Sequence, residues 1–270
     1  MERGLDMGEV IVVTSGKGGV GKTTTSANIG TGLAAAGHSV VLVDMDIGLR
    51  NLDVLMGLEK RIVYDLVDVT SGSCRLKQAL IRDKRFENLF LLPASQTKDK
   101  TAVNSEQMKV LAAELKENFD YAIIDCPAGI EQGFDNAVAG ADWAIVVCTP
   151  EVSAVRDADR IIGLLNAMEL KNPKLIINRI RPAMIKRGDM MTTEDILDIL
   201  DVELIGAIPD HESIIISTNR GRPAVMDKKS TAGEAYRLIT RRIQGEVVPF
   251  MNLEEHHGML HRLKRLVGLR

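Results

Sequence analysis

The stretch that decides the fold lies near the start of the chain and reads Val10-Ile11-Val12-Val13-Thr14-Ser15-Gly16-Lys17-Gly18-Gly19-Val20-Gly21-Lys22-Thr23-Thr24. A β-branched apolar run opens it, which predicts a strand, and a helical pattern follows from Thr23. The glycines between them have the spacing GxxxxGK[ST] of a phosphate-binding loop, in which backbone N–H groups and a helix N-terminus face phosphate oxygens. We expect Lys22 to bridge the β- and γ-phosphates of a nucleotide and the Thr23 hydroxyl to hold Mg²⁺.

Short apolar runs like the first recur along the chain, separated by helix-length stretches. Each run is nearly continuous in apolar character, which is typical of parallel strands covered on both faces. The alternation predicts an α/β fold, a single-domain P-loop NTPase with a mostly parallel sheet and helices on both faces. The expected strands are Val10–Thr14, Val40–Asp44, Leu89–Leu92, Tyr121–Asp125, Ala144–Cys148, Leu175–Asn178 and Leu204–Ile208, and the clearest helices are Thr23–Ala36, Ser105–Asn118, Ser153–Met168 and Thr193–Leu200.

This pattern divides the chain into three parts. Residues 1–8 are expected to be an N-terminal extension, residues 9–248 the nucleotide-binding domain, and residues 249–270 a linker with a C-terminal helix. No charged-then-apolar leader opens the chain, which favours a cytosolic protein.

Composition excludes several classes of protein. The chain has 270 residues, a formal net charge of −3 and 3% aromatic residues, so binding of single strands by base stacking is not expected. Its longest apolar stretch, Trp143–Cys148, is far shorter than the ~20 residues that cross a bilayer. Three dispersed cysteines, Cys74, Cys126 and Cys148, cannot assemble a disulfide framework or a zinc site.

Carboxylates follow two of the expected strands. Asp44 and Asp46 end one run and Asp125 ends another, and ligands of open α/β sheets bind at such strand ends. We expect Asp125 to hold the metal, Asp44 to support the metal shell and Asp46 to position the attacking water. The alternative for any one of them is a helix N-cap.

The amino-acid sequences of the loop and of three further segments resemble those of a known family. Lys17-Gly-Gly-Val-Gly-Lys22-Thr23 resembles the deviant Walker A signature of the MinD/ParA ATPases, and the segments Asp44–Asp53, Asp125–Glu131 and Pro150–Arg160 resemble the MinD branch of that family. The resemblance implies binding of ATP and Mg²⁺ through residues 17–24, namely Lys17, Gly18, Gly19, Val20, Gly21, Lys22, Thr23 and Thr24. It also implies an ATP-dependent homodimer in which Lys17 stabilises phosphate charge in trans. The helix in residues 150–160 is then either a partner-docking face or an ordinary solvated surface.

The same resemblance points to an adenine-binding side. Asn178 and Arg179 follow one expected strand, and Pro209 and Asp210 follow another. An amide can both donate to and accept from the edge of adenine. The alternative is that Asn178 simply caps a turn at the strand end.

The last residues form an amphipathic pattern. At about 100° per residue, Met259, Leu260, Leu263, Leu266 and Val267 share one side, and Arg262, Lys264 and Arg265 lie on the other. A basic face opposite an apolar stripe is typical of a helix that lies in a membrane surface, and the alternative is a last helix packed on the core. The resemblance supports membrane targeting.

The MinD branch implies a division-site switch. Its implied partners are a second copy of the chain, the inhibitor MinC, MinE or another topological factor, and anionic lipids, without specific nucleic acid. The chain would then be cytoplasmic and peripheral on the membrane. The alternatives are a flagellar-placement ATPase of the same subfamily and a ParA-like DNA-partitioning ATPase, whose DNA binding would depend steeply on salt.

Overall fold

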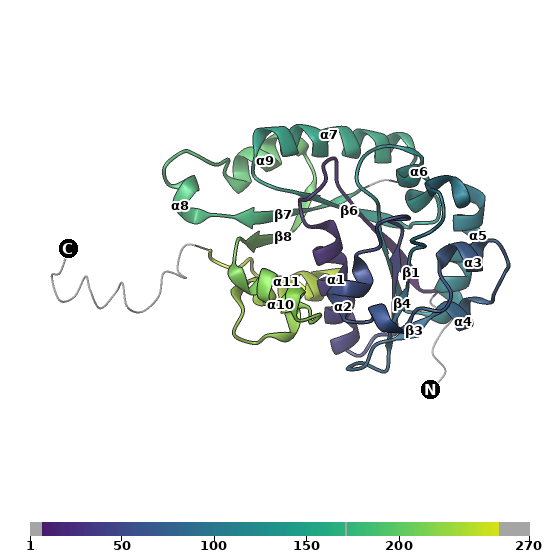
Figure 1. Ribbon diagram of the computed structural model, residues 1–270. Coiled ribbons are helices and arrows are strands. Elements are labelled where there is room, and N and C mark those ends of the chain that lie inside the picture. Colours follow the sequence, from purple (N-terminus) through teal and green to yellow (C-terminus); the bar gives the residue numbers. More distant parts are fainter. Residues whose placement is uncertain (1–6, 171, 254–270) are drawn as a thin grey trace.

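The computed structural model describes residues 7–170 and 172–253. Its centre is an eight-stranded sheet in the order β3-β4-β2-β5-β1-β6-β7-β8 (Figure 1). All strand pairs are parallel except β3–β4. The strands are β1 (Glu9–Thr14), β2 (Val40–Asp44), β3 (Ile81–Arg82), β4 (Leu89–Leu92), β5 (Tyr121–Asp125), β6 (Trp143–Cys148), β7 (Lys174–Ile180) and β8 (Glu203–Pro209).

Helices cover both faces of this sheet (Figure 1). They are α1 (Lys22–Ala35), α2 (Leu52–Met56), α3 (Leu66–Thr70), α4 (Leu76–Ala79), α5 (Ser105–Asn118), α6 (Gln132–Val138), α7 (Val152–Ala167), α8 (Pro182–Ile185), α9 (Thr193–Leu200), α10 (Glu212–Asn219) and α11 (Thr231–Ile243), with 3₁₀ turns η1 (Glu59–Arg61), η2 (Lys100–Ala102) and η3 (Ala224–Met226). The predicted fold class is confirmed, and the seven predicted strands are present. The short antiparallel edge strand β3 was not predicted.

Alternate residues of each strand supply two hydrophobic cores. Val10 and Val12 pack on the face that carries α5, α6, α7 and α9, whereas Ile11 and Val13 pack on the face that carries α1, α2 and α11. Both strand faces are therefore buried, which explains why the sequence shows continuous apolar runs instead of alternation.

Side-chain caps fix the starts of helices α5 and α9. The Asn104 side chain accepts from the backbone N–H of Gln107 at the start of α5, and Thr192 does the same for Asp195 at the start of α9. Helix α1 has no side-chain cap and begins after Gly21, whose φ is +102°. Its first N–H groups therefore have no side-chain acceptor at the N-cap, which suits a helix that faces phosphate.

Two parts of the predicted domain plan lie beyond the described residues. The extension overlaps residues 1–6, and the amphipathic segment lies within 254–270. Within residues 7–170 and 172–253, no helix combines the length and the apolar character needed to cross a bilayer.

Candidate functional site

The phosphate-binding loop joins β1 to α1, and two close approaches restrict it to glycine. A Cβ on Gly21 would lie 2.4 Å from Nδ2 of Asn178, and one on Gly16 would lie 2.3 Å from the carbonyl oxygen of Asp157. Gly19 has φ +78° and nothing within 4 Å of its Cβ position. The loop is therefore in close contact with the rest of the protein at Gly16 and Gly21, whereas the space beside Gly19 is open.

The two loop lysines have different environments. Lys22 is 7% exposed, and its Nζ donates to the Ser15 hydroxyl at 3.0 Å. Ser15 in turn donates to the carbonyl oxygen of Lys17 at 2.7 Å, which fixes the loop backbone. The Lys17 side chain is exposed. The Lys22 side chain is thus buried within the phosphate-binding site, whereas the exposed Lys17 side chain is free to contact the surface of another molecule.

Asp125 lies at the end of β5 beside the first turns of α1. Its Oδ1 accepts from the Ser26 hydroxyl at 2.9 Å, and the Thr23 hydroxyl also hydrogen-bonds to this carboxylate. Burial and the nearby Asp44 raise the pKa of Asp125 to about 7, although Thr23, Ser26 and Lys22 act in the opposite direction. The predicted metal residues Thr23 and Asp125 are therefore in contact.

Asp44 occupies the equivalent place at the end of β2. Its Oδ1 accepts from the backbone N–H of Asp46 at 2.9 Å, and its Oδ2 accepts from Asn51 and Leu52, each at 3.1 Å. Burial raises the pKa of Asp44 to about 6 in spite of these three bonds. Asp44 thus shapes the loop that carries Asp46 and fixes the start of α2, although the N-cap residue of α2 is Asn51.

The predicted adenine residues lie at the ends of β7 and β8. The Asn178 amide donates to the carbonyl oxygen of Val20 at 2.7 Å, and its Oδ1 accepts from the N–H of Arg179 at 2.9 Å. Asn178 therefore holds the phosphate-binding loop as well as the turn that follows it. Arg179 has φ +59°, which is unusual for a residue other than glycine.

Pro209 and Asp210 are placed by pairing with β7. Pro209 is the register partner of Ile180, and the N–H of Asp210 donates to the Ile180 carbonyl at 2.9 Å. The Asp210 carboxylate pairs with Arg181 at 2.5 Å. The ends of β7 and β8 are thus neighbours.

Two residues of this site were not singled out from the sequence. Ser15 holds Lys22, and Ser26 holds Asp125, through the contacts described above. Ser15 directly precedes the loop, and this position in the sequence could have indicated a contact with the loop. Ser26 lies 99 residues from Asp125 in the chain, so no local pattern could pair them.

The donor set fits a magnesium nucleotide. Within residues 7–170 and 172–253, no group of three His, Cys, Asp or Glu side chains could enclose a metal. One carboxylate, Asp125, and one hydroxyl, that of Thr23, are instead adjacent beside the loop. Mg²⁺ is commonly held by one or two carboxylates together with water and substrate phosphates, so these residues suit it.

Comparison with known proteins identifies the family. An AAA domain family model matches residues 8–177. The septum site-determining protein MinD of Bacillus subtilis is 60% identical over 267 residues, which cover 98% of this chain and 100% of that protein. The chain belongs to the MinD family. It is therefore an ATPase of the septum site-determining group, and the resemblance carried by the sequence motifs is confirmed.

Solved MinD structures have the same fold. MinD in the MinC:MinD cell division protein complex of Aquifex aeolicus has a TM-score of 0.85 and 51% identity, over 90% of this chain and 99% of that one. MinD of Pyrococcus horikoshii, complexed with Mg-ADP, has a TM-score of 0.80 and 30% identity over 88% and 96% of the two chains. A ParA family ATPase of Chlorobium tepidum is 21% identical with a TM-score of 0.75, which is a likeness of fold alone.

Proposed function

We propose that this chain is an ATP-driven switch that dimerises with ATP, attaches reversibly to the membrane and recruits a division inhibitor to control septum placement. The proposed ATP binding and hydrolysis rest mainly on the contact of Asp125 with Ser26 and Thr23. This contact lies directly beside the glycine-rich loop and the buried Lys22. A bound magnesium ion would neutralise phosphate charge at Thr23 and Asp125, with Asp44 supporting them.

The loop residues divide the chemistry among them. The backbone of residues 17–24 binds the phosphates, and Lys22 contacts their oxygens from inside the site. Asp46 positions the attacking water. The hydrogen bond from its backbone N–H to Asp44 fixes the Asp46 backbone at the edge of the site. Asn178, Arg179, Pro209 and Asp210 border the adenine.

Lys17 acts across the dimer. Its exposed side chain can reach a second copy, where it stabilises the charge that develops on the phosphates. The site is then complete only in the dimer, so hydrolysis depends on assembly. Because bond cleavage in phosphoryl transfer needs mainly positioning and charge stabilisation, we expect slow basal turnover.

The C-terminal segment provides the membrane contact. The apolar residues Met259, Leu260, Leu263, Leu266 and Val267 insert among anionic lipids, and Arg262, Lys264 and Arg265 face the headgroups. One such segment binds weakly, but two in a dimer raise the avidity by about 10²–10⁴. The protein is then cytoplasmic as a monomer and peripheral on the membrane as a dimer.

The partners follow from the relatives. The Aquifex MinD is found in a complex with MinC, and 51% identity supports MinC as a partner here. MinE or another topological factor would stimulate hydrolysis and release the dimer. Specific nucleic acid binding is not part of this proposal.

Sedimentation velocity tests the dimer step. Wild type should be monomeric with MgADP and dimeric with MgATP, and Lys17→Ala should shift this equilibrium toward the monomer or leave a dimer that does not hydrolyse ATP. A monomer in every nucleotide state would contradict the proposal.

A further inference from the structure

An apolar groove lies where the described chain ends. Its volume is about 770 Å³, and its lining residues come from β7, α8, α9, β8 and the linker that follows α11. Strands β7 and β8 lie with α8 and α9 at one end of the molecule (Figure 1). Its apolar wall includes Ile180, Ile185, Leu197, Leu204, Phe250 and Leu253. Strand β8 is the last strand at this end of the sheet, and no other strand in the described part of the chain covers it.

The linker is tied to this edge by Arg242. The guanidinium of Arg242 donates to the carbonyl oxygen of Ile205 at 3.0 Å, to that of Val248 at 3.1 Å and to that of Pro249 at 2.8 Å. It also lies 4.0 Å from the centre of the Phe250 ring. Phe250 is 49% exposed although it lines the groove. The linker therefore enters the groove in a fixed place.

Leu253 carries the chain to the groove wall itself. Its side chain packs against the core on the α7 and α9 face of the sheet. The six residues from 254 to 259 span at most about 20 Å when extended. The apolar residues 259–267 are thus tethered within reach of the groove, and no other copy is needed to supply them.

The charges beside the groove are opposite to those of residues 256–270. Glu194 lines the groove, and Asp195, Asp198 and Asp201 are further exposed acids on or directly after α9, a helix without a basic residue. At the two ends of α8, Arg181 and Arg187 are paired with Asp210 and Asp189. Residues 256–270 contain four basic residues and no acid. The apolar groove thus has acidic residues on and beside α9, and the sequence that follows the linker is apolar and basic.

We propose that the groove holds the apolar face of residues 259–267 of the same chain when the protein is off the membrane. The same five apolar side chains would be used in the groove and in the bilayer, so the two states exclude each other. Docking hides an apolar stripe that would otherwise be exposed to water. That docking inhibits membrane attachment rests on the proposed membrane binding. The docking itself does not depend on that proposal.

Disulfide trapping tests the docking without any membrane. In a Cys74→Ser background, Thr193→Cys on the groove is paired with Leu263→Cys, since Cys126 and Cys148 are buried. The nucleotide-free monomer should form an intramolecular disulfide, seen as faster migration on a non-reducing gel, and urea should prevent it. The control pairs Leu263→Cys with Val110→Cys, which is 71% exposed on α5. Equal yields from both pairs, or a linked dimer alone, would overturn the proposal.

A charge reversal tests the inhibition of attachment. Glu194→Lys with Asp198→Lys should release the segment, and if it is docked about 90% of the time, nucleotide-free binding to phosphatidylglycerol vesicles should rise up to about tenfold. The matched control, Glu114→Lys with Glu117→Lys on the exposed side of α5, adds the same charge elsewhere. An equal rise in both variants would overturn the inhibition. A disulfide at the groove with no wild-type vesicle binding in MgATP would instead count against the proposed function alone.

Discussion

Asp44 and Asp125 are register partners on the paired strands β2 and β5, and each is 1% exposed. Val13, which precedes the phosphate-binding loop by three residues, is the partner of Asp125 on the other side. The sheet thus brings two buried carboxyl groups and the loop to one edge. Burial, with a smaller contribution from the Asp46 charge, raises the pKa of Asp44 to about 6, and burial together with the Asp44 charge raises the pKa of Asp125 to about 7.

This pair should make the nucleotide-free protein less stable as pH rises. The unfolded carboxyls ionise near 3.8, while the folded pair keeps protons up to about pH 7, so the folded state binds more protons in that window. The free energy of unfolding should therefore fall between about pH 4 and pH 7, by up to about 7 kcal/mol. Urea denaturation across this range measures it. In Asp125→Asn the slope should be smaller, and an equal slope in both proteins would contradict this account.

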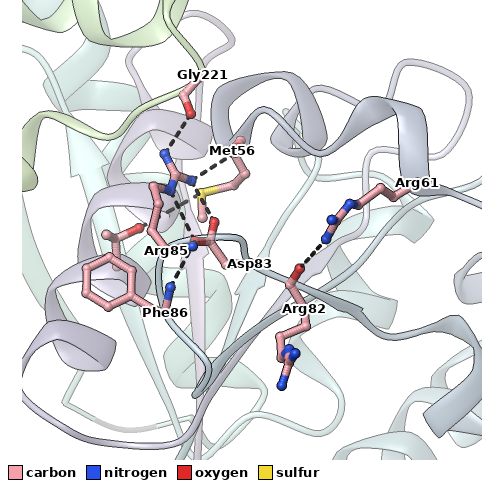
Figure 2. Close-up of polar contacts among 8 residues, drawn as sticks. Met56, Arg61, Arg82, Asp83, Arg85, Phe86 and Gly221 are labelled. Carbon is pink, nitrogen blue, oxygen red and sulfur yellow. Dashed lines mark hydrogen bonds and ion pairs between the residues drawn. The ribbon is translucent and has the colours of Figure 1, made fainter.

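Arg85 should be a strong contributor to stability. Its guanidinium donates to both oxygens of the fully buried Asp83 carboxylate, and to the carbonyl oxygens of Met56 and Gly221 (Figure 2). Burial alone would raise the pKa of Asp83, but the bonds from Arg85 outweigh it and lower that pKa. Arg85→Ala would leave a buried carboxylate unpaired and should cost about 3–5 kcal/mol.

The neighbouring Arg82 supplies the control for that measurement. Arg82 is exposed, and its backbone oxygen, not its side chain, accepts from Arg61 (Figure 2). In urea denaturation, Arg82→Ala should change the free energy of unfolding by less than about 0.5 kcal/mol. The account of Arg85 fails if the two alanine variants are equally stable.

The two loop lysines should separate binding from hydrolysis. Lys17→Ala should keep ATP affinity within a few-fold, because the side chain is exposed in its own subunit, but should lower hydrolysis by about 10²–10³. Lys22→Ala should lose ATP binding itself, since this lysine lies inside the site. Calorimetric titration and steady-state turnover give the two readouts. Full hydrolysis by Lys17→Ala would remove the role in trans.

Glycine substitutions should have opposite effects at two positions. Gly21→Ala places a Cβ 2.4 Å from the Asn178 amide at φ +102°, so it should destabilise the loop and abolish nucleotide binding. Gly163→Ala lies on the exposed side of α7 with nothing within 4 Å, so it should stabilise the protein by about 0.5–1 kcal/mol. Thermal melts with and without ATP measure both. Equal losses at both positions would show that the loop has no special need for glycine.

Much of this fold is visible in the sequence because its strands are buried on both faces. The run Val40–Asp44 was predicted with its observed bounds, since five buried residues leave a continuous apolar signal. The edge strand β3 has only two residues and left no such signal. Strand-end carboxylates could also be recognised locally.

Pairings across the chain could not be predicted in this way. The sequence contains Asp44 and Asp125 but not their register, which follows from the placement of β5 between β2 and β1. Arg85 contacts the Gly221 carbonyl 136 residues away, through a backbone atom that no sequence pattern marks. Asn178 was predicted to contact adenine or to cap a turn, and its amide also holds the loop at Val20.

Membrane attachment that follows the nucleotide state is the central claim, and vesicle co-sedimentation tests it most directly. The full chain is mixed with phosphatidylglycerol vesicles in MgATP, in MgADP and without nucleotide, beside Leu263→Glu and the control Val110→Glu. We expect wild type and Val110→Glu to sediment with vesicles in MgATP alone, and Leu263→Glu to stay in the supernatant throughout. Equal binding of wild type in all three nucleotide states would contradict the account.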